Sequence, residues 1–146
     1  MSIQVYNRQR AVRLRLPWLR KLAPLALERC LEHSADGRFA LRQLEEVEVA
    51  IVTDRVIEDV HLRFLKTPGA TDVITFEYGE IVISAETAAA YARQYKHDVN
   101  RELGLYIIHG LLHLNGYDDL TPGDAELMHR TQQDILEACL ADLPTV

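Results

Sequence analysis

The sequence predicts a single α+β domain in which a small mixed sheet of four strands packs with about five helices. Two observations support this prediction. Short runs of alternating apolar and polar residues are typical of strands, and they are interspersed with longer segments whose apolar residues recur at helical spacing. A length of 146 residues and an apolar fraction of 48% fit one hydrophobic core, so we expect one domain over residues 1–146.

The N-terminal segment predicts strands followed by a helix. Apolar residues alternate with polar ones over residues 3–5 and again over 12–16, which indicates one or two short strands. Pro17 then opens a helix that extends to about residue 31. Pro24 lies inside this segment and predicts either a kink or a later start.

The middle of the chain predicts three strands around one helix. Residues 46–53 alternate charged and β-branched side chains, which indicates a strand with one buried face. A helix over residues 54–65 ends at the proline- and glycine-containing loop 66–71. Residues 72–78 and 80–84 are rich in β-forming side chains and predict neighbouring strands.

Three further helices are predicted after these strands. Ser84 is a suitable N-cap for a helix over residues 85–95, and an apolar helix follows over residues 103–114 after a polar break. Gly116 ends that helix. A threonine N-cap followed by a proline then predicts a last helix over residues 122–140.

The charge is distributed unevenly along the chain. The net charge is −6, yet residues 1–42 hold nine basic and three acidic residues, and the remainder holds seven basic and nineteen acidic residues. A basic N-terminal face can hold a polyanion such as a nucleic acid while the acidic part provides a site for a cation. A merely solvated basic face remains the alternative interpretation. The basic residues concerned are Arg8, Arg10, Arg13, Arg15, Arg20, Lys21, Arg29, Arg38 and Arg42.

Composition also excludes several classes of protein. No apolar run reaches the roughly 18 to 20 residues of a membrane span. The N-terminus lacks the apolar region and cleavage site of a secretory signal, so we expect a cytoplasmic protein without membrane partners. Cys30 and Cys139 lie in apolar helical surroundings, which favours two buried free thiols over a disulfide.

The motif with the clearest chemistry is H-x3-H-x2-G-x2-D. His109 and His113 lie one turn apart on the same face of a predicted helix, where they can share a cation. The turn at Gly116 allows Asp119 to fold back toward the two imidazoles. This spacing follows the logic of zinc metalloprotease motifs, in which two helical histidines and a third ligand after a glycine turn leave one position open for water. We therefore expect one zinc ion per chain, held in a cleft by these three side chains.

The same motif disfavours a standard zinc protease. Gly110 occupies the position of the protease's general-base glutamate. A metal can still activate water or polarise a phosphoryl oxygen, which suits hydrolysis of a phosphodiester. The candidates for a general base are then Glu77, Glu80 and Asp118, and the sequence does not fix their distance from the metal.

Structural roles compete with these assignments. Asp118 is the rival of Asp119 as the third ligand. Asp72 is either part of the site or a capping residue at the start of a strand. The other four histidines lack comparable spacing and are expected at the surface or in packing contacts, namely His33, His61, His97 and His129.

Three segments together resemble the YbeY family of bacterial rRNA maturation factors. They are residues 71–76 (TDVITF), 79–84 (GEIVIS) and 109–119 (HGLLHLNGYDD), and the resemblance covers about residues 45 to 140. The resemblance implies a metal-dependent, single-strand-specific endoribonuclease that matures the 3′ end of the small-subunit 16S rRNA and takes part in ribosome quality control. The implied partners are single-stranded rRNA and the small ribosomal subunit, with no DNA expected.

The chain departs from the family pattern at three places. Asp119 replaces the family's third histidine, a ligand set that also suits iron, manganese or nickel. Leu65 stands where the family usually has an arginine, and Arg63 or the basic N-terminal region is a candidate substitute. The segment between Phe76 and Gly79 is shorter than in many relatives.

Two alternatives to a nuclease remain open. One is a noncatalytic ribosome-assembly factor with a structural metal, which the leucine in place of the family arginine favours. A structural zinc normally has four protein ligands, whereas only three are visible in this motif, which favours catalysis. The other alternative is a peptidase of unusual mechanism, which Gly110 disfavours.

Overall fold

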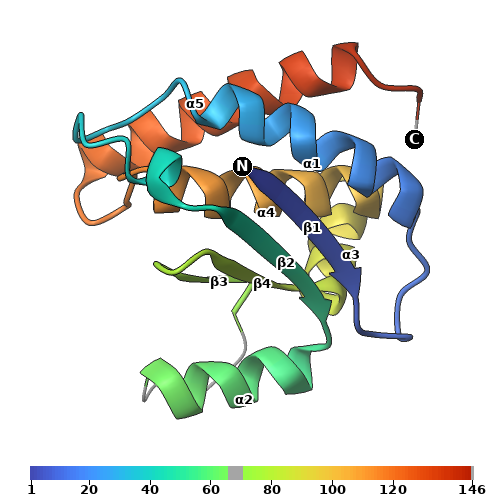
Figure 1. Cartoon of the computed structure of the whole chain (residues 1–146). Coiled ribbons are helices and arrows are strands. Elements are labelled where there is room, and N and C mark those ends of the chain that lie inside the picture. The colour runs from blue at the N-terminus through green and yellow to red at the C-terminus, as the bar shows by residue number, and fades with distance from the viewer. Residues whose placement is uncertain (66–70, 146) are drawn as a thin grey trace.

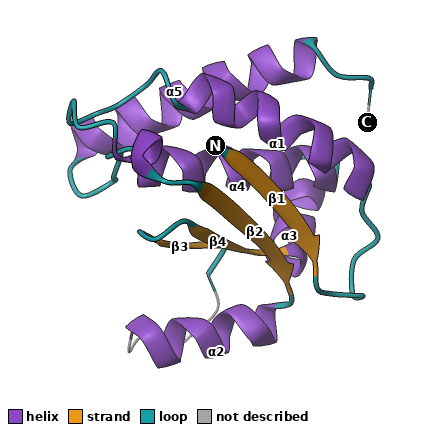
Figure 2. Ribbon diagram, viewed as in Figure 1, coloured by secondary structure: helices purple, strands orange, loops and turns teal. Residues whose placement is uncertain are grey.

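The structure contains one four-stranded sheet with helices on both of its faces (Figures 1 and 2). It is a computed structural model, and it describes residues 1–65 and 71–145. The strands are β1 (Ser2–Asn7), β2 (Glu46–Val52), β3 (Val73–Phe76) and β4 (Glu80–Ser84). The helices are α1 (Leu16–Cys30), the short 3-10 helix η1 (Ala40–Gln43), α2 (Asp54–Leu65), α3 (Ala85–Gln94), α4 (Val99–Leu114) and α5 (Pro122–Ala141).

The sheet is mixed, with strand order β1-β2-β4-β3. β1 pairs parallel to β2, β2 pairs parallel to β4, and the short edge strand β3 runs antiparallel to β4. The parallel pairs are joined through helices, which is the usual way to connect parallel strands. The predicted α+β fold with a small mixed sheet and five α-helices is therefore confirmed.

Each face of the sheet has its own apolar cluster. On the two central strands, Val49 and Ile81 belong to the main core, which includes residues of α1, α4 and α5. Ala50 and Val82, the next residues along, belong to a smaller cluster with Ile57 of α2. Successive side chains of a strand point to opposite faces. The sheet therefore lies between a thick helical layer and α2 alone, as Figure 1 shows.

Of the one or two strands predicted for the N-terminal segment, the described residues form one, β1. Residues 8–15 form no regular element. The Gln9 side chain donates to the carbonyl oxygen of Val12 (3.0 Å) and accepts from its backbone N–H (2.8 Å), which folds the chain into a turn. Val12 and Leu14, two of the alternating apolar residues, are partly buried and pack against the main core although the segment is irregular. α1 then begins one residue before Pro17 and continues through Pro24 without a later start.

Side-chain caps begin three of the helices. The Ser84 hydroxyl accepts from the Thr87 backbone N–H (3.2 Å), and Thr121 caps α5 in the same way, as predicted. α4 begins at Val99, earlier than the predicted residue 103, because Asp98 accepts from the backbone N–H of Asn100 (2.7 Å). The N-cap Asp98 therefore lies in the polar segment before residue 103, which the sequence analysis places outside the helix.

The remaining structural predictions have mixed outcomes. β3 is shorter than the predicted 72–78 because the chain turns at Gly79, whose φ is +113°. Most of the predicted loop 66–71 lies outside the described residues.

Cys30 and Cys139 are buried and free, as expected. Of the helices that the structure describes, none is both long and apolar enough to cross a membrane.

Candidate functional site

α4 is the central element of the predicted site and lies very close to the sheet. It is buried along most of its length, and it packs against β3, β4, α1, α3 and α5. A Cβ atom added at Gly110 would lie 2.7 Å from Ile81 Cγ2 and 2.9 Å from its Cδ1. Gly110 thus allows the helix to approach β4 closely. This packing role explains a glycine where zinc proteases carry a catalytic glutamate.

The turn after α4 is fixed by hydrogen bonds and by a close contact with another loop. Gly116 has a φ of +96°, and the backbone N–H of Tyr117 donates to the carbonyl oxygen of Leu112 (3.0 Å), which ends the helix in a Schellman-type turn. A Cβ atom at Gly116 would lie 2.7 Å from the carboxyl carbon of Asp36. The buried Asn115 amide donates to the carbonyl oxygens of Cys30 and His33. The loop after α1 therefore supports the turn that carries the predicted third ligand.

The two predicted histidines lie side by side, as the spacing indicates. The ring centroids of His109 and His113 are 5.4 Å apart, and both residues are half-buried. His109 Nδ1 lies 2.9 Å from Oε1 of Gln132 on α5. Because an amide oxygen only accepts, this contact assigns the proton to Nδ1 and leaves the Nε2 lone pair available. A hydrogen bond of this kind is how proteins orient imidazoles that bind metals.

The surroundings of His113 favour its neutral imidazole form. Burial lowers the pKa of His113 below its usual value of 6.5, and the neighbouring His109 lowers it further. Asp119, Asp118 and a backbone hydrogen bond at Tyr117 act in the opposite direction without reversing the shift. A neutral imidazole is the form that binds a metal ion, so this environment suits His113 to that role.

The carboxylates of the following turn are less well placed. Asp118 is half-buried, and its Oδ1 accepts from the backbone N–H of Leu120 (3.1 Å). Asp119 is exposed. In residues 1–65 and 71–145, no three His, Cys, Asp or Glu side chains are gathered closely enough to hold a metal. The structure thus brings two of the three predicted ligands together, and Asp119 as the third stays a prediction.

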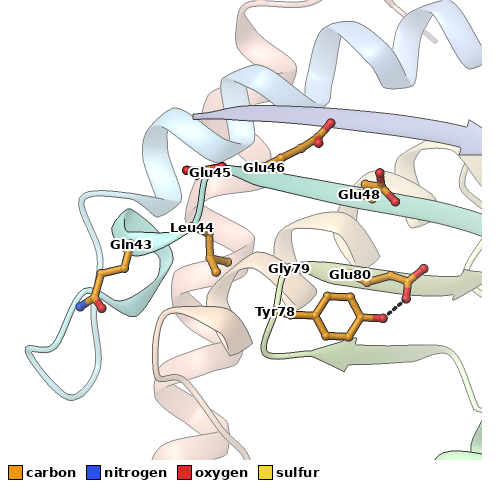
Figure 3. Close-up of a pocket in the computed structure, with 8 residues that line it drawn as sticks. All are labelled: Gln43, Leu44, Glu45, Glu46, Glu48, Tyr78, Gly79 and Glu80. Atoms are coloured by element: carbon orange, nitrogen blue, oxygen red, sulfur yellow. Dashed lines mark hydrogen bonds between the residues drawn. The ribbon is translucent and has the colours of Figure 1, made fainter.

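The structure separates Glu80 from the histidines. Ile81, the next residue of β4, faces Gly110 of α4, so Glu80 lies on the opposite face of the sheet. There it lines a cavity of about 460 Å³ with Glu48 and accepts a hydrogen bond from the Tyr78 hydroxyl (Figure 3). That bond is the largest cause that raises the pKa of Tyr78 to about 12. This position argues against Glu80 as a base for water held at the histidines. Glu77 is exposed on the turn after β3 and stays a prediction.

A cavity of about 280 Å³ adjoins His109 where α3, α4, α5 and β3 meet. Its polar wall includes residues that sequence reasoning did not single out, namely Glu102, Tyr106 and Gln132, together with Asp72 and Tyr91. Asp72 begins the edge strand, where its carboxylate accepts from the Val73 backbone N–H (2.8 Å), so it is both a capping residue and part of the cavity. These residues come from distant parts of the sequence, and no local motif marks them.

Several basic residues of the N-terminal region are engaged within the fold. The guanidinium groups of Arg15, Arg20 and Arg42 donate to backbone carbonyl oxygens. Arg29 pairs with Asp142 at 3.5 Å. Arg38 lies in the loop that contacts Gly116, and its side chain is exposed. Arg38 is thus an exposed basic residue in the loop that contacts the turn after the histidines.

Comparisons with known proteins agree with the motif. A family model described as "Endoribonuclease YbeY" matches residues 4–140. A protein of that name from Lysinibacillus sphaericus is 32% identical over 130 residues, covering 76% of this chain and 82% of its own. A protein of the same name from Lacticaseibacillus casei is 34% identical over 118 residues, which cover 69% of this chain and 78% of that protein. A solution structure from Thermotoga maritima has a TM-score of 0.65 at 23% identity, covers 96% of this chain and 90% of that one, and supports the fold alone.

Proposed function

The chain belongs to the endoribonuclease YbeY family, and we propose that it is a metal-dependent enzyme that cuts single-stranded regions of rRNA. An endoribonuclease role in rRNA processing follows from the family. The finer parts of the proposal are maturation of the 3′ end of 16S rRNA, a role in ribosome quality control, and action on the small subunit in the cytoplasm.

One observation carries the metal dependence. His109 and His113 lie with their rings 5.4 Å apart, the first oriented by Gln132 and the second with its pKa lowered by burial. Two half-buried imidazoles without a shared ligand would each need separate hydrogen-bond partners. Their arrangement is suited to a common cation, and the carboxylates of Asp118 and Asp119 are close enough to act electrostatically on His113.

The donor set fits a divalent metal of the zinc type. Two imidazoles and one carboxylate are a common ligand set for zinc, and also for iron, manganese and nickel. His109, His113 and Asp119 would hold the ion. A bound metal supplies an acidified water and polarisation of a phosphoryl oxygen. Gln132 orients His109, and Glu77 or Asp118 is the remaining candidate for accepting a proton.

The loop beside the site offers a cation for the RNA backbone. Arg38 lies two residues after Asp36, which contacts Gly116 in the turn after α4. Arg63, by contrast, lies on α2 and pairs with Asp59 at 3.4 Å. α2 covers the face of the sheet opposite α4. Arg38 is therefore the better candidate to replace the family arginine whose position Leu65 occupies.

The proposal is tested by the cleavage of single-stranded rRNA. The zinc-loaded protein should cut the RNA, and a chelator or the substitution His113→Ala should abolish the cut. His129→Ala is a matched control, because His129 is an exposed histidine of α5 and should leave cleavage unchanged. Equal cleavage by wild type and His113→Ala would indicate a contaminating nuclease and overturn the proposal.

A noncatalytic assembly factor is the second candidate. The hydrophobic Leu65 at the family's arginine position and the placement of Glu80 on the other face of the sheet favour it. In that case the protein would bind rRNA with the same affinity in wild type and His113→Ala, and neither would cut it. A structural metal would need additional ligands, and the described residues do not gather even three.

A further inference from the structure

Tyr106 carries a buried polar group at the wall of the cavity beside His109. The residue is only 4% exposed, and its hydroxyl forms no hydrogen bond of good geometry in the described part of the chain, although the Glu102 carboxylate is near enough to raise its pKa. Such a group costs stability, since a buried hydroxyl normally finds a partner. The residue itself lines the 280 Å³ cavity, so a ligand in that cavity is a natural source of the missing bond.

The rest of the wall defines what kind of ligand fits. Glu102 is almost buried, bonds His97 through one carboxylate oxygen (2.7 Å), and lies near the Tyr106 hydroxyl. Asp72 is exposed at the mouth of the cavity. Two carboxylates repel a phosphate and attract N–H donors. The ring of Tyr91 is half-exposed beside them and offers a face for stacking.

We propose that this cavity binds a guanine base of single-stranded RNA next to the bond that is cut. The Watson–Crick edge of guanine presents a carbonyl acceptor, a ring N–H and an exocyclic amino group in that order. Tyr106 donates to the carbonyl at the buried end, Glu102 accepts from the ring N–H, and Asp72 accepts from the amino group at the mouth. On this edge uracil presents one ring N–H, and cytosine and adenine each present one amino group. Each of these bases therefore has a single donor group and cannot satisfy both carboxylates.

The inference rests on the proposed nuclease function, because only an RNA enzyme has reason to hold a base beside His109. It goes beyond that function by naming a base and the residues that select it. Gln132 links the two sites, since its amide lines the cavity and its oxygen accepts from His109. A guanine bound in the cavity would thus be separated from the proposed metal ligand His109 by the Gln132 side chain alone.

The test measures binding, and it uses chelator-treated protein so that no cleavage occurs. Three uridine hexamers with 2′-O-methyl sugars carry a single guanine, hypoxanthine or adenine, and their dissociation constants are measured by fluorescence anisotropy. Hypoxanthine is guanine without the exocyclic amino group. We expect the guanine oligomer to bind about tenfold more tightly than the hypoxanthine oligomer, because a hydrogen bond to a charged group is lost.

Two variants locate the effect in this cavity. Tyr106→Phe removes the hydroxyl and should weaken guanine and hypoxanthine oligomers alike by roughly three- to tenfold, with no loss of thermal stability. Asp72→Asn should remove most of the preference for guanine over hypoxanthine. Asp59→Asn, on exposed α2, removes the same charge elsewhere and should leave the preference unchanged. Unchanged binding in Tyr106→Phe would overturn the proposal.

The two proposals fail in different ways. If the wild-type protein cuts rRNA but binds guanine and hypoxanthine oligomers equally, the guanine site is wrong and the nuclease function stands. If the preference for guanine is present and depends on Asp72 while no RNA is cut, the base site stands and the nuclease function is wrong.

Discussion

His109 Nδ1 lies 2.9 Å from Gln132 Oε1, which joins the middle of α4 to α5 across 23 positions of the chain. This contact fixes the tautomer of the imidazole and directs Nε2 away from α5. The hydrogen bond therefore orients the His109 imidazole as a metal ligand would be oriented. The same amide borders the cavity that we assign to a nucleobase.

Replacing Gln132 by alanine should weaken zinc binding by about 10- to 100-fold, because the imidazole loses the partner that orients it. Competition with a chromogenic chelator measures this affinity. Gln133→Ala is the matched control, since Gln133 is the next residue of α5 and makes no hydrogen bond to a histidine of the described chain. Equal loss in both variants would point to a general effect on α5 rather than to the hydrogen bond.

Gly110→Ala should destabilise the protein by about 1 kcal/mol. Overpacking against Ile81 costs about 1–3 kcal/mol, and the better helix propensity of alanine offsets about 1 kcal/mol of that. Gly123→Ala is the control, because a Cβ atom at Gly123 meets nothing within 4 Å. Urea unfolding compares the two variants. Our account would be contradicted if Gly110→Ala were as stable as Gly123→Ala.

Gly116→Ala should cost more than the same change at Gly37. Both glycines have positive φ, +96° and +75°, so both substitutions strain the backbone by about 1–3 kcal/mol. Only the Cβ atom at Gly116 collides with Asp36, whereas Gly37 has open space around it. The excess loss of unfolding free energy therefore measures the contact between the two loops, and an excess of zero would exclude it.

The stability of the metal-free protein should fall as the pH drops below 6.5. The pKa of His113 is lowered in the folded state, so the unfolded chain binds a proton that the folded chain resists. Unfolding free energy therefore rises with pH through this region and levels off above 6.5. His113→Asn should flatten the pH profile of urea unfolding between about pH 5 and 7.5. Identical profiles would show that His113 does not contribute.

The sequence indicates those parts of the site that are local in the chain. The spacing of His109 and His113 on one helix is enough to predict that their rings lie side by side, and Gly116 predicts the turn that follows. Gln132 and Tyr106 could not be found in this way. They join the site only through the packing of α4 against α5 and α3, and such long-range contacts leave no periodic signal.

The position of Glu80 away from the histidines has a different physical cause. β4 is covered on both faces, by α4 on one side and by α2 on the other, so apolar residues occur at consecutive positions along it. A strand buried on both faces has no clean alternation of apolar and polar residues. The sequence therefore predicts the strand but does not determine which side chains face the histidines.

Metal analysis of the purified protein decides whether His109 and His113 share a cation. Elemental analysis and zinc titration should give one zinc ion per wild-type chain, loss of that ion in His113→Ala, and weaker binding in Asp119→Ala than in Asp124→Ala. Asp124 is an exposed aspartate at the start of α5 and serves as the matched carboxylate. Full zinc occupancy in His113→Ala would contradict the account, because the paired histidines would then have no part in holding the metal.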